Sequence, residues 1–183
     1  ESAYAFSGGL HGVGVSVTNA LSKKIEVLVW RQSFEWGIIF ENGEVVSSLE
    51  KKHRVKNKTG TSVRVWPDKK YFDDQTIPLE PLKNSLRARA VLLPGVNFTF
   101  QSEKSNSRYS WCYQRGLKDY FSETLVNTDT IAPIWEGESY IESGDEFFSE
   151  GEGVEWILAF SNTGPFVKES YVNLIPTLGG GTH

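Results

Sequence analysis

Ser7-Gly8-Gly9-Leu10-His11-Gly12-Val13-Gly14 is the stretch that constrains the structure of this 183-residue chain most strongly. Four of its eight residues are glycine, and residues 15–22 suit a short helix. Glycine accepts positive φ angles and lets a ligand approach the backbone closely. A helix that starts beside such a loop turns free N–H groups and the positive end of its dipole toward an anion. We therefore expect a tight loop that opens into a helix and binds a polyphosphate, with a ligand-free helix entry as the alternative.

Two widespread phosphate loops do not fit this stretch. Val15 stands where a Walker loop requires lysine. If Gly12 and Gly14 are the first two glycines of a dinucleotide fingerprint, Val17 stands at the position of the third. A Walker nucleotidase and a Rossmann fold are therefore both disfavoured.

The rest of the sequence mixes strand and helix patterns. Apolar residues at helical spacing predict helices at residues 82–93 and 116–126. Strands are expected at residues 25–30, 34–40, 61–66, 96–100, 109–113, 131–135, 154–160 and 169–174. The first two form a hairpin, a turn signal follows at Asn42-Gly43, and the acidic stretch 136–153 suggests an exposed hairpin or loop. Strands and helices do not alternate regularly, so the predicted fold class is α+β.

Composition narrows the class of protein. Hydrophobic residues make up 39% of the chain and charged residues 23%, enough apolar side chain for a core. The formal net charge of −4 lacks the basic excess of a self-sufficient duplex-binding domain. Cys112 is the only cysteine, which excludes an internal disulfide and favours a reducing compartment.

The sequence predicts no contact with a membrane. No apolar run reaches the ~18 residues that span a bilayer, and residues 1–6 do not resemble a signal peptide. We therefore expect a cytoplasmic protein. The chain has no methionine and begins within a pattern, so we interpret it as an internal part of a longer protein.

Several motifs together resemble one family. The glycine stretch, continued through Asn19-Ala20-Leu21-Ser22, resembles the ATP-lid glycine box of bacterial type IIA topoisomerase B subunits, which belong to the GHKL ATPases. Thr59-Gly60-Thr61 resembles that family's adenine-side strand, and Gly180-Gly181-Thr182-His183 its later signature. The stretches 111–117 and 170–177 are more similar to the topoisomerase IV branch than to gyrase B.

The resemblance implies a fold and a domain arrangement. Residues 1–115 would be the later part of a GHKL-type ATPase domain, an α/β sandwich with a mixed sheet. Residues 116–183 would begin a transducer domain that resembles domain 2 of ribosomal protein S5. The change in pattern near Arg115 agrees with this boundary.

The resemblance also implies a nucleotide site. Main-chain N–H groups would hold the triphosphate at seven consecutive positions, Gly9, Leu10, His11, Gly12, Val13, Gly14 and Val15. Tyr4 would also contact the nucleotide, and the Thr61 hydroxyl would help to bind adenine, usually through water. An ordinary strand threonine is the alternative for Thr61.

The implied function is that of an ATP-driven topoisomerase IV B subunit, in which ATP binding and hydrolysis drive dimer closure and passage of one duplex through another. The cofactors would be ATP and Mg²⁺. The partners would be a second B subunit, the A subunit in an A2B2 heterotetramer, and duplex DNA through the holoenzyme. Gyrase B, another GHKL ATPase, and a noncatalytic GHKL-fold interaction module remain alternatives.

No catalytic or metal-ligating residue is assigned in this chain. The resemblance places the family's catalytic glutamate and magnesium-binding asparagine before Glu1, so the isolated chain is not expected to hydrolyse ATP. A lone His11 is a poor metal candidate, and Cys112 is more readily a packed or edge residue than a nucleophile. The basic run 51–58 could meet DNA, but a solvated basic loop is favoured, and Arg31 at a hairpin tip either borders a pocket or faces water.

Overall fold

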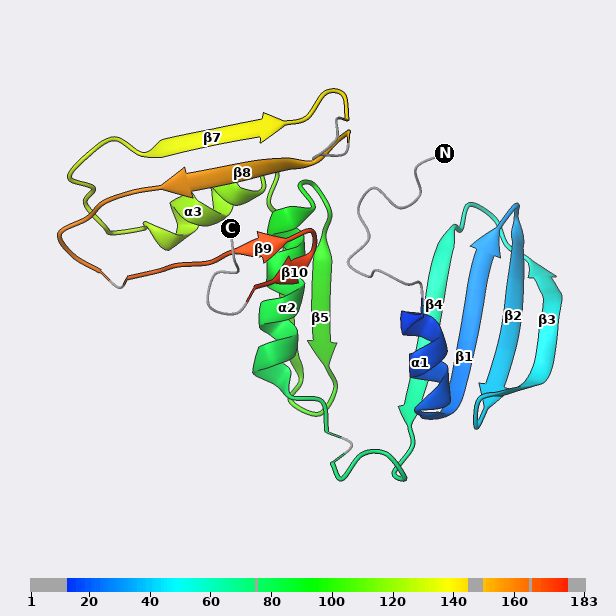
Figure 1. Cartoon of the computed structure of the whole chain (residues 1–183). Coiled ribbons are helices and arrows are strands. Elements are labelled where there is room, and N and C mark those ends of the chain that lie inside the picture. Colours follow the sequence, from blue (N-terminus) through cyan, green and yellow to red (C-terminus); the bar gives the residue numbers. More distant parts are fainter. Residues whose placement is uncertain (1–12, 75, 145–149, 165, 178–183) are drawn as a thin grey trace. The chain divides into compact units, whose positions relative to one another are not determined.

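The computed structural model describes residues 13–74, 76–144, 150–164 and 166–177. The described chain divides into two compact units, one that ends at Ile77 and one that begins at Pro78. Each unit mixes helices and strands (Figure 1). The predicted α+β class is therefore confirmed.

The first unit contains a four-stranded antiparallel sheet in the order β3-β2-β1-β4. Its strands are β1 (Ser22–Arg31), β2 (Phe34–Glu41), β3 (Glu44–Arg54) and β4 (Gly60–Pro67). The resemblance implies a mixed sheet, whereas every strand pair in the described part of the chain is antiparallel.

Two tight turns join β1 to β2 and β2 to β3. Gln32 and Ser33 have φ angles of 54° and 62°, and Asn42 and Gly43 have φ angles of 52° and 88°. Positive φ at both central residues matches the right-handed twist of hairpin strands. The predicted hairpin is confirmed. The interpretation of residues 51–58 as a loop is wrong for 51–54, because these residues end β3.

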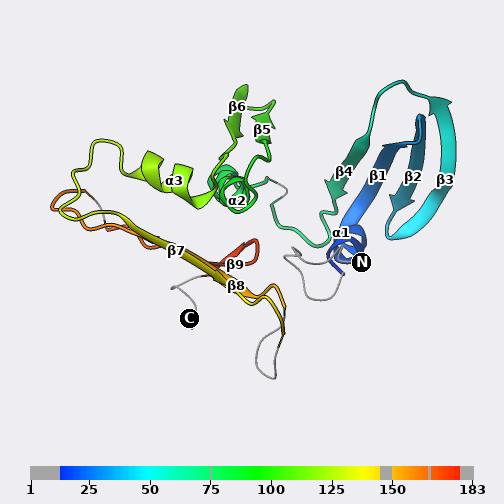
Figure 2. The same ribbon diagram turned by 90° about the horizontal axis from the view of Figure 1, so that it is seen from above.

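The helix α1 (Gly14–Ala20) packs beside β1 (Figures 1 and 2). Asn19 Nδ2 donates to the Gly43 carbonyl at 3.0 Å, and Ser22 Oγ donates to the Thr18 carbonyl at 2.6 Å. The backbone N–H of Asp68 donates to the Leu21 carbonyl at 3.1 Å. These bonds attach the end of the helix to the sheet.

The core of the second unit lies between two helices and a hairpin. Its elements are α2 (Leu79–Leu92), β5 (Phe98–Ser102), β6 (Ser107–Trp111) and α3 (Leu117–Thr124). Ala90, Val91 and Tyr113 are buried, and Leu117 and Tyr120 of α3 pack against them. The helices predicted at 82–93 and 116–126 are therefore confirmed, together with the apolar face of the second.

Gly116 makes the close packing of α3 against α2 possible. Its φ angle is 52°, in the region that favours glycine. A Cβ at this position would lie 2.9 Å from the Val91 carbonyl oxygen and 3.0 Å from Pro94 Cγ. Both the backbone angle and the space therefore require glycine.

The chain beyond α3 forms two hairpins. The strands are β7 (Trp135–Tyr140) and β8 (Gly153–Leu158), then β9 (Tyr171–Val172) and β10 (Ile175–Pro176). The Trp156 ring covers Gly137 and the Tyr140 ring covers Gly153, each directly across the strand pair. The acidic stretch 136–153 therefore begins in β7 and ends in β8, so of the two predicted forms the hairpin is the one observed.

The predicted domain boundary at 115/116 falls inside the second unit. Helix α2, which precedes the boundary, contacts α3, which follows it. The division into residues 1–115 and 116–183 stays a prediction.

Candidate functional site

The predicted phosphate loop is described in its last part. Tyr4, Gly9, Leu10, His11 and Gly12 lie outside the described residues. Val13 is the residue before α1, and Gly14 and Val15 begin the helix. The expected opening of the glycine stretch into a helix is confirmed from Val13 onward.

Within the described part of the chain, no side chain covers the start of α1 at Gly14. An ideal Cβ at Gly14 would meet no atom of the described residues within 4 Å, and Val13 and Val15 are 54% and 78% exposed. The first backbone N–H groups of a helix have no partner within it, and the first turn of α1 carries no acidic residue. Such a helix start can accept an anion through main-chain donors.

Thr61 lies near the start of β4 and is exposed. It stands directly opposite Val29, which stands opposite Trp36, so the three side chains share one face of the sheet. Ser62 is on the other face, opposite Leu28. The register of β4 against β1 thus determines the face of the sheet on which the Thr61 hydroxyl lies. Thr61 and Gly14 belong to the same unit.

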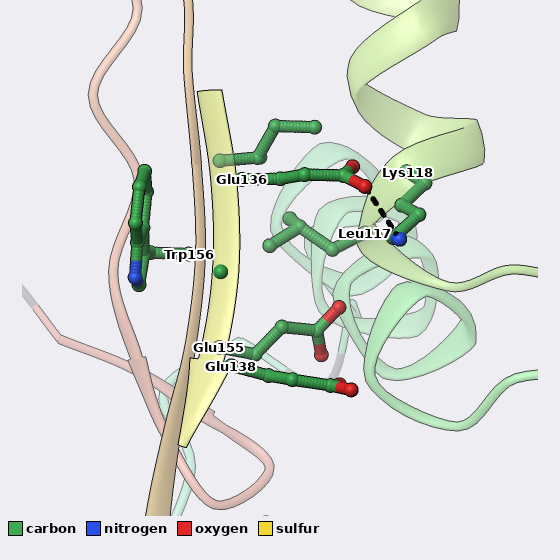
Figure 3. Close-up of a pocket in the computed structure, with 8 residues that line it drawn as sticks. Leu117, Lys118, Glu136, Glu138, Glu155 and Trp156 are labelled. Carbon is green, nitrogen blue, oxygen red and sulfur yellow. Dashed lines mark hydrogen bonds and ion pairs between the residues drawn. The ribbon is translucent and has the colours of Figure 1, made fainter. Parts of the chain in front are cut away.

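A hollow of about 180 Å³ opens between α3 and the β7–β8 hairpin (Figure 3). Lys118 pairs with Glu136 at 2.7 Å, and this hydrogen bond raises the pKa of Lys118. Glu138 and Glu155 are direct cross-strand neighbours that turn the same way, while Trp156 lies on the other side of the hairpin. Of the sequence-predicted nucleotide residues that the structure describes, none lines this hollow.

A larger hollow, of about 640 Å³, lies between α2 and residues 168–177. Two hydrogen-bonded groups stand beside it. Arg87 Nε donates to the Tyr113 hydroxyl at 3.1 Å, and that hydroxyl donates to Glu123 at 2.8 Å. The Tyr120 hydroxyl donates to Glu169 at 2.6 Å, and the Tyr171 hydroxyl donates to the same carboxylate. These bonds join α2, α3 and the segment around β9.

Burial is the main cause of unusual pKa values in these groups. It raises the pKa of Tyr113, while the hydrogen bond from Arg87 opposes the rise. Burial, followed by the hydrogen bond to Glu169, raises the pKa of Tyr120 to about 12 and raises that of Tyr171 as well. All three hydroxyls therefore keep their protons at neutral pH and act as donors.

Sequence reasoning did not identify these tyrosines as a group. Tyr113 and Tyr171 both lie inside the two stretches that resemble the topoisomerase IV branch, 111–117 and 170–177. Their position in these two stretches was the available sequence signal for the group. The partners Arg87 and Glu169 lie in neither stretch and become visible only in the fold.

The other singled-out residues have plain surroundings. Cys112 is exposed next to the end of β6, and Gln114 Nε2 donates to its sulfur at 3.3 Å. Within the described ranges, no group of three or more His, Cys, Asp or Glu side chains could hold a metal ion. No helix in the described part of the chain is both long and apolar enough to cross a bilayer.

Similarity to known proteins agrees with the family suggested by the motifs. No family model matches the chain. It is 47% identical over 182 residues to the B subunit of DNA topoisomerase 4 from Salmonella typhimurium, an alignment that covers 98% of this chain and 28% of that protein. The chain thus spans well under a third of the length of this curated relative.

Solved structures match the fold. The ATP-binding domain of Francisella tularensis topoisomerase IV, in complex with a small-molecule inhibitor, superposes with a TM-score of 0.63 at 33% identity, over 93% of this chain and 45% of that one. The 43K ATPase domain of Thermus thermophilus gyrase B, in complex with an aminocoumarin, gives a TM-score of 0.74 at 25% identity, over 91% and 44%.

The motifs, the fold and the sequence identity agree. The fold matches ATPase domains of topoisomerase IV and gyrase B, with TM-scores of 0.63 and 0.74. The chain therefore belongs to the family of B subunits of bacterial type IIA DNA topoisomerases.

Proposed function

We propose that this chain contributes the phosphate-binding helix start and the adenine-side strand of a topoisomerase IV B subunit. In the intact enzyme, ATP binding and hydrolysis would drive dimer closure and the passage of one duplex through another. The observation that carries the proposal is the start of α1, where no described atom lies within 4 Å of a Cβ built on Gly14 and the first turn has no acidic side chain.

The residues present suit a nucleotide. Val13, Gly14 and Val15 would hold phosphate oxygens through main-chain N–H groups, together with Gly9, Leu10, His11 and Gly12, which lie outside the described residues. Thr61 would orient adenine through its hydroxyl, directly or through water. Bound ATP, with Mg²⁺, supplies the phosphoanhydride whose hydrolysis powers the enzyme.

The proposed partners follow from the family. They are a second B subunit, the A subunit in an A2B2 assembly, and duplex DNA held by the holoenzyme. The proposed location is the cytoplasm. The higher sequence identity to the topoisomerase IV proteins than to the gyrase B structure supports this branch over gyrase.

Replacing Gly14 by valine in the intact subunit tests the nucleotide site. The described residues leave room for the added side chain, so a loss of affinity in a folded variant reports obstruction of the ligand. We expect ATP binding, measured by calorimetry, to weaken by at least about tenfold, or ~1.4 kcal/mol. Val17→Ala, on an exposed position of the same helix, should leave the affinity unchanged. Full affinity in a folded Gly14→Val subunit would contradict the proposal.

Two alternatives have their own tests. A gyrase-type protein would share the phosphate contacts but introduce negative supercoils with its A subunit, so a supercoiling assay on the reconstituted holoenzyme separates the two. A noncatalytic module with the same fold would bind no nucleotide in the intact subunit.

A further inference from the structure

The net charge of the chain hides an opposite charge in its two units. Gly9–Ile77 holds 11 Lys or Arg and 8 Asp or Glu, whereas the rest of the chain holds 8 and 15. The unit with the sheet is therefore basic, although the whole chain carries −4. Within it, no acidic residue occurs between Glu50 and Asp68.

Six of the 11 Lys and Arg side chains of this unit lie at one end and along one edge of the sheet. The β1–β2 turn, the last residues of β3 and the loop from β3 to β4 lie at the same end (Figure 1). The backbone N–H of Val55 donates to the Ser33 carbonyl at 2.9 Å, which joins the turn to the loop. β3 is an edge strand, and the side chains of its successive basic residues point to opposite faces of the sheet. We name this surface the basic edge; it consists of Arg31, Lys51, Lys52, His53, Arg54, Lys56 and Lys58, all exposed.

Aromatic rings and a glycine hold three of the lysines in place. The ammonium of Lys51 lies 3.4 Å from the centre of the Phe34 ring, and that of Lys58 lies 3.5 Å from the Trp30 ring. Lys52 extends across Gly37, where a Cβ would lie 2.5 Å from its Cε. Fixed lysine stems lose less freedom when their charged ends meet a partner.

One carboxylate, that of Glu35, lies against this surface. The Glu35 side chain is only 13% exposed, and its carboxylate accepts a 2.8 Å hydrogen bond from the Trp30 indole. His53 approaches it at 3.8 Å. In the described part of the chain, Arg31, Arg54 and Lys56 form no ion pair, so their charges remain available.

We infer that the basic edge contacts the phosphate backbone of duplex DNA. Residues 51–54 alone extend ~10 Å along the strand, and the loop and turn lengthen the surface further. Duplex DNA presents about one negative charge per ~1.7 Å of its axis, so several phosphates face a surface of this length. Such contacts position DNA without reading its sequence. The inference rests on the proposed function, which brings duplex DNA to the enzyme, and it adds a contact surface that the nucleotide site does not require.

Salt dependence in the intact subunit tests the inference. The variant Arg31→Gln/Arg54→Gln/Lys56→Gln removes three exposed charges without touching the lysines held by aromatic rings. Its matched control, Lys23→Gln/Lys69→Gln/Lys70→Gln, removes three charges from the other end of the same sheet. Binding of a short fluorescent duplex is measured by anisotropy over a series of KCl concentrations. Each lost phosphate contact lowers the slope of log affinity against log salt by about 0.9, so the first variant should lose about 2 to 3 and the control none.

A crosslinking measurement locates the contact. With Cys112→Ser in both proteins, a photoreactive group attached to Lys56→Cys should crosslink to the duplex, whereas the same group on Lys69→Cys should not. Equal slopes for the triple variant and the wild type, or crosslinking only from the control position, overturns the inference. A change in self-association without a change in DNA binding also overturns it and assigns the basic edge to an acidic protein partner. ATP binding by the same wild-type protein is measured in parallel, because its absence refutes the proposed function and its presence isolates a failure of the DNA contact.

Discussion

The hydroxyl of Tyr120 donates a 2.6 Å hydrogen bond to the carboxylate of Glu169, although 49 residues separate the two along the chain. Tyr171 donates to the same carboxylate, and Arg87 lies over the Tyr120 ring at 4.9 Å. One carboxylate thus connects α3 to the segment around β9, so its removal should affect both Tyr120 and Tyr171.

Replacing Glu169 by glutamine should lower the pKa of Tyr120 from about 12 toward its ordinary value of 10. The charged acceptor is lost, while burial, the larger cause, remains, so the fall should be partial. Phenolate absorbance measures it, as the difference between each protein and its Tyr120→Phe counterpart. A midpoint that stays near 12 in Glu169→Gln contradicts a role for the carboxylate.

The same tyrosine should make the folded unit less stable in alkali. Its folded pKa is raised, so between pH 10 and about 12 the unfolded chain has lost a proton that the folded chain keeps. The stabilisation is therefore fully present below pH 10 and is lost as the pH rises through about 12. Thermal melting of the intact subunit at pH 9 and pH 11 should show a smaller alkaline loss for Tyr120→Phe than for the wild type.

Tyr113→Phe should destabilise the second unit by ~1 kcal/mol, because it removes two hydrogen bonds and leaves the 3.0 Å pair between Arg87 and Glu123 in place. Amide hydrogen exchange in α3 of the intact subunit measures the free energy of local opening. Tyr140→Phe, at a position 56% exposed, is the control and should change it by less than about 0.5 kcal/mol. Equal exchange in the two variants excludes a structural role for the Tyr113 hydroxyl.

Gly116→Ala should accelerate exchange in α3 more strongly. The added Cβ meets the Val91 carbonyl oxygen at 2.9 Å and the φ angle is unfavourable for alanine, a combined cost of ~2 to 3 kcal/mol. Gly151→Ala separates the two causes, since Gly151 has a φ angle of 84° with no described atom within 4 Å, and the free energies of unfolding of the two variants are compared. The first variant should be the more damaging, and the reverse order would show that the contact with Val91 is unimportant.

Thr61→Val should weaken ATP binding modestly, by ~0.5 to 1.5 kcal/mol, because a single hydrogen bond to the base or to water is lost while the shape is nearly kept. Calorimetry on the intact subunit measures the affinity. Ser62→Ala, on the next residue but the opposite face of β4, should have no effect. Equal losses from both variants would point to a disturbed strand instead of a lost contact.

Local signals in the sequence were sufficient for much of the fold. The Asn42-Gly43 turn, the helical spacing that ends before Pro94-Gly95, and the apolar face with Leu117 and Tyr120 each depend on neighbours within a few residues. The structure confirms all three. The helix that starts at Gly14 was predicted in the same way.

The third strand of the sheet could not be predicted from its pattern. Every residue of β3 except Ser47 is exposed, so the strand has no buried face to produce alternation of apolar and polar residues. It forms because β2 supplies hydrogen bonds along its length. The bond between Tyr120 and Glu169 escaped prediction for a related reason, since nothing near either residue indicates the other.

Two aromatic rings that pack over glycines fix the register of the β7–β8 hairpin. Trp156 and Tyr140 each occupy space that only the glycine directly opposite leaves free. If β8 shifted by one residue, both rings would face side chains, and Glu155 would turn to the opposite face of the hairpin from Glu138. The alignment of charge along this hairpin therefore depends on two residues that carry no side chain at all.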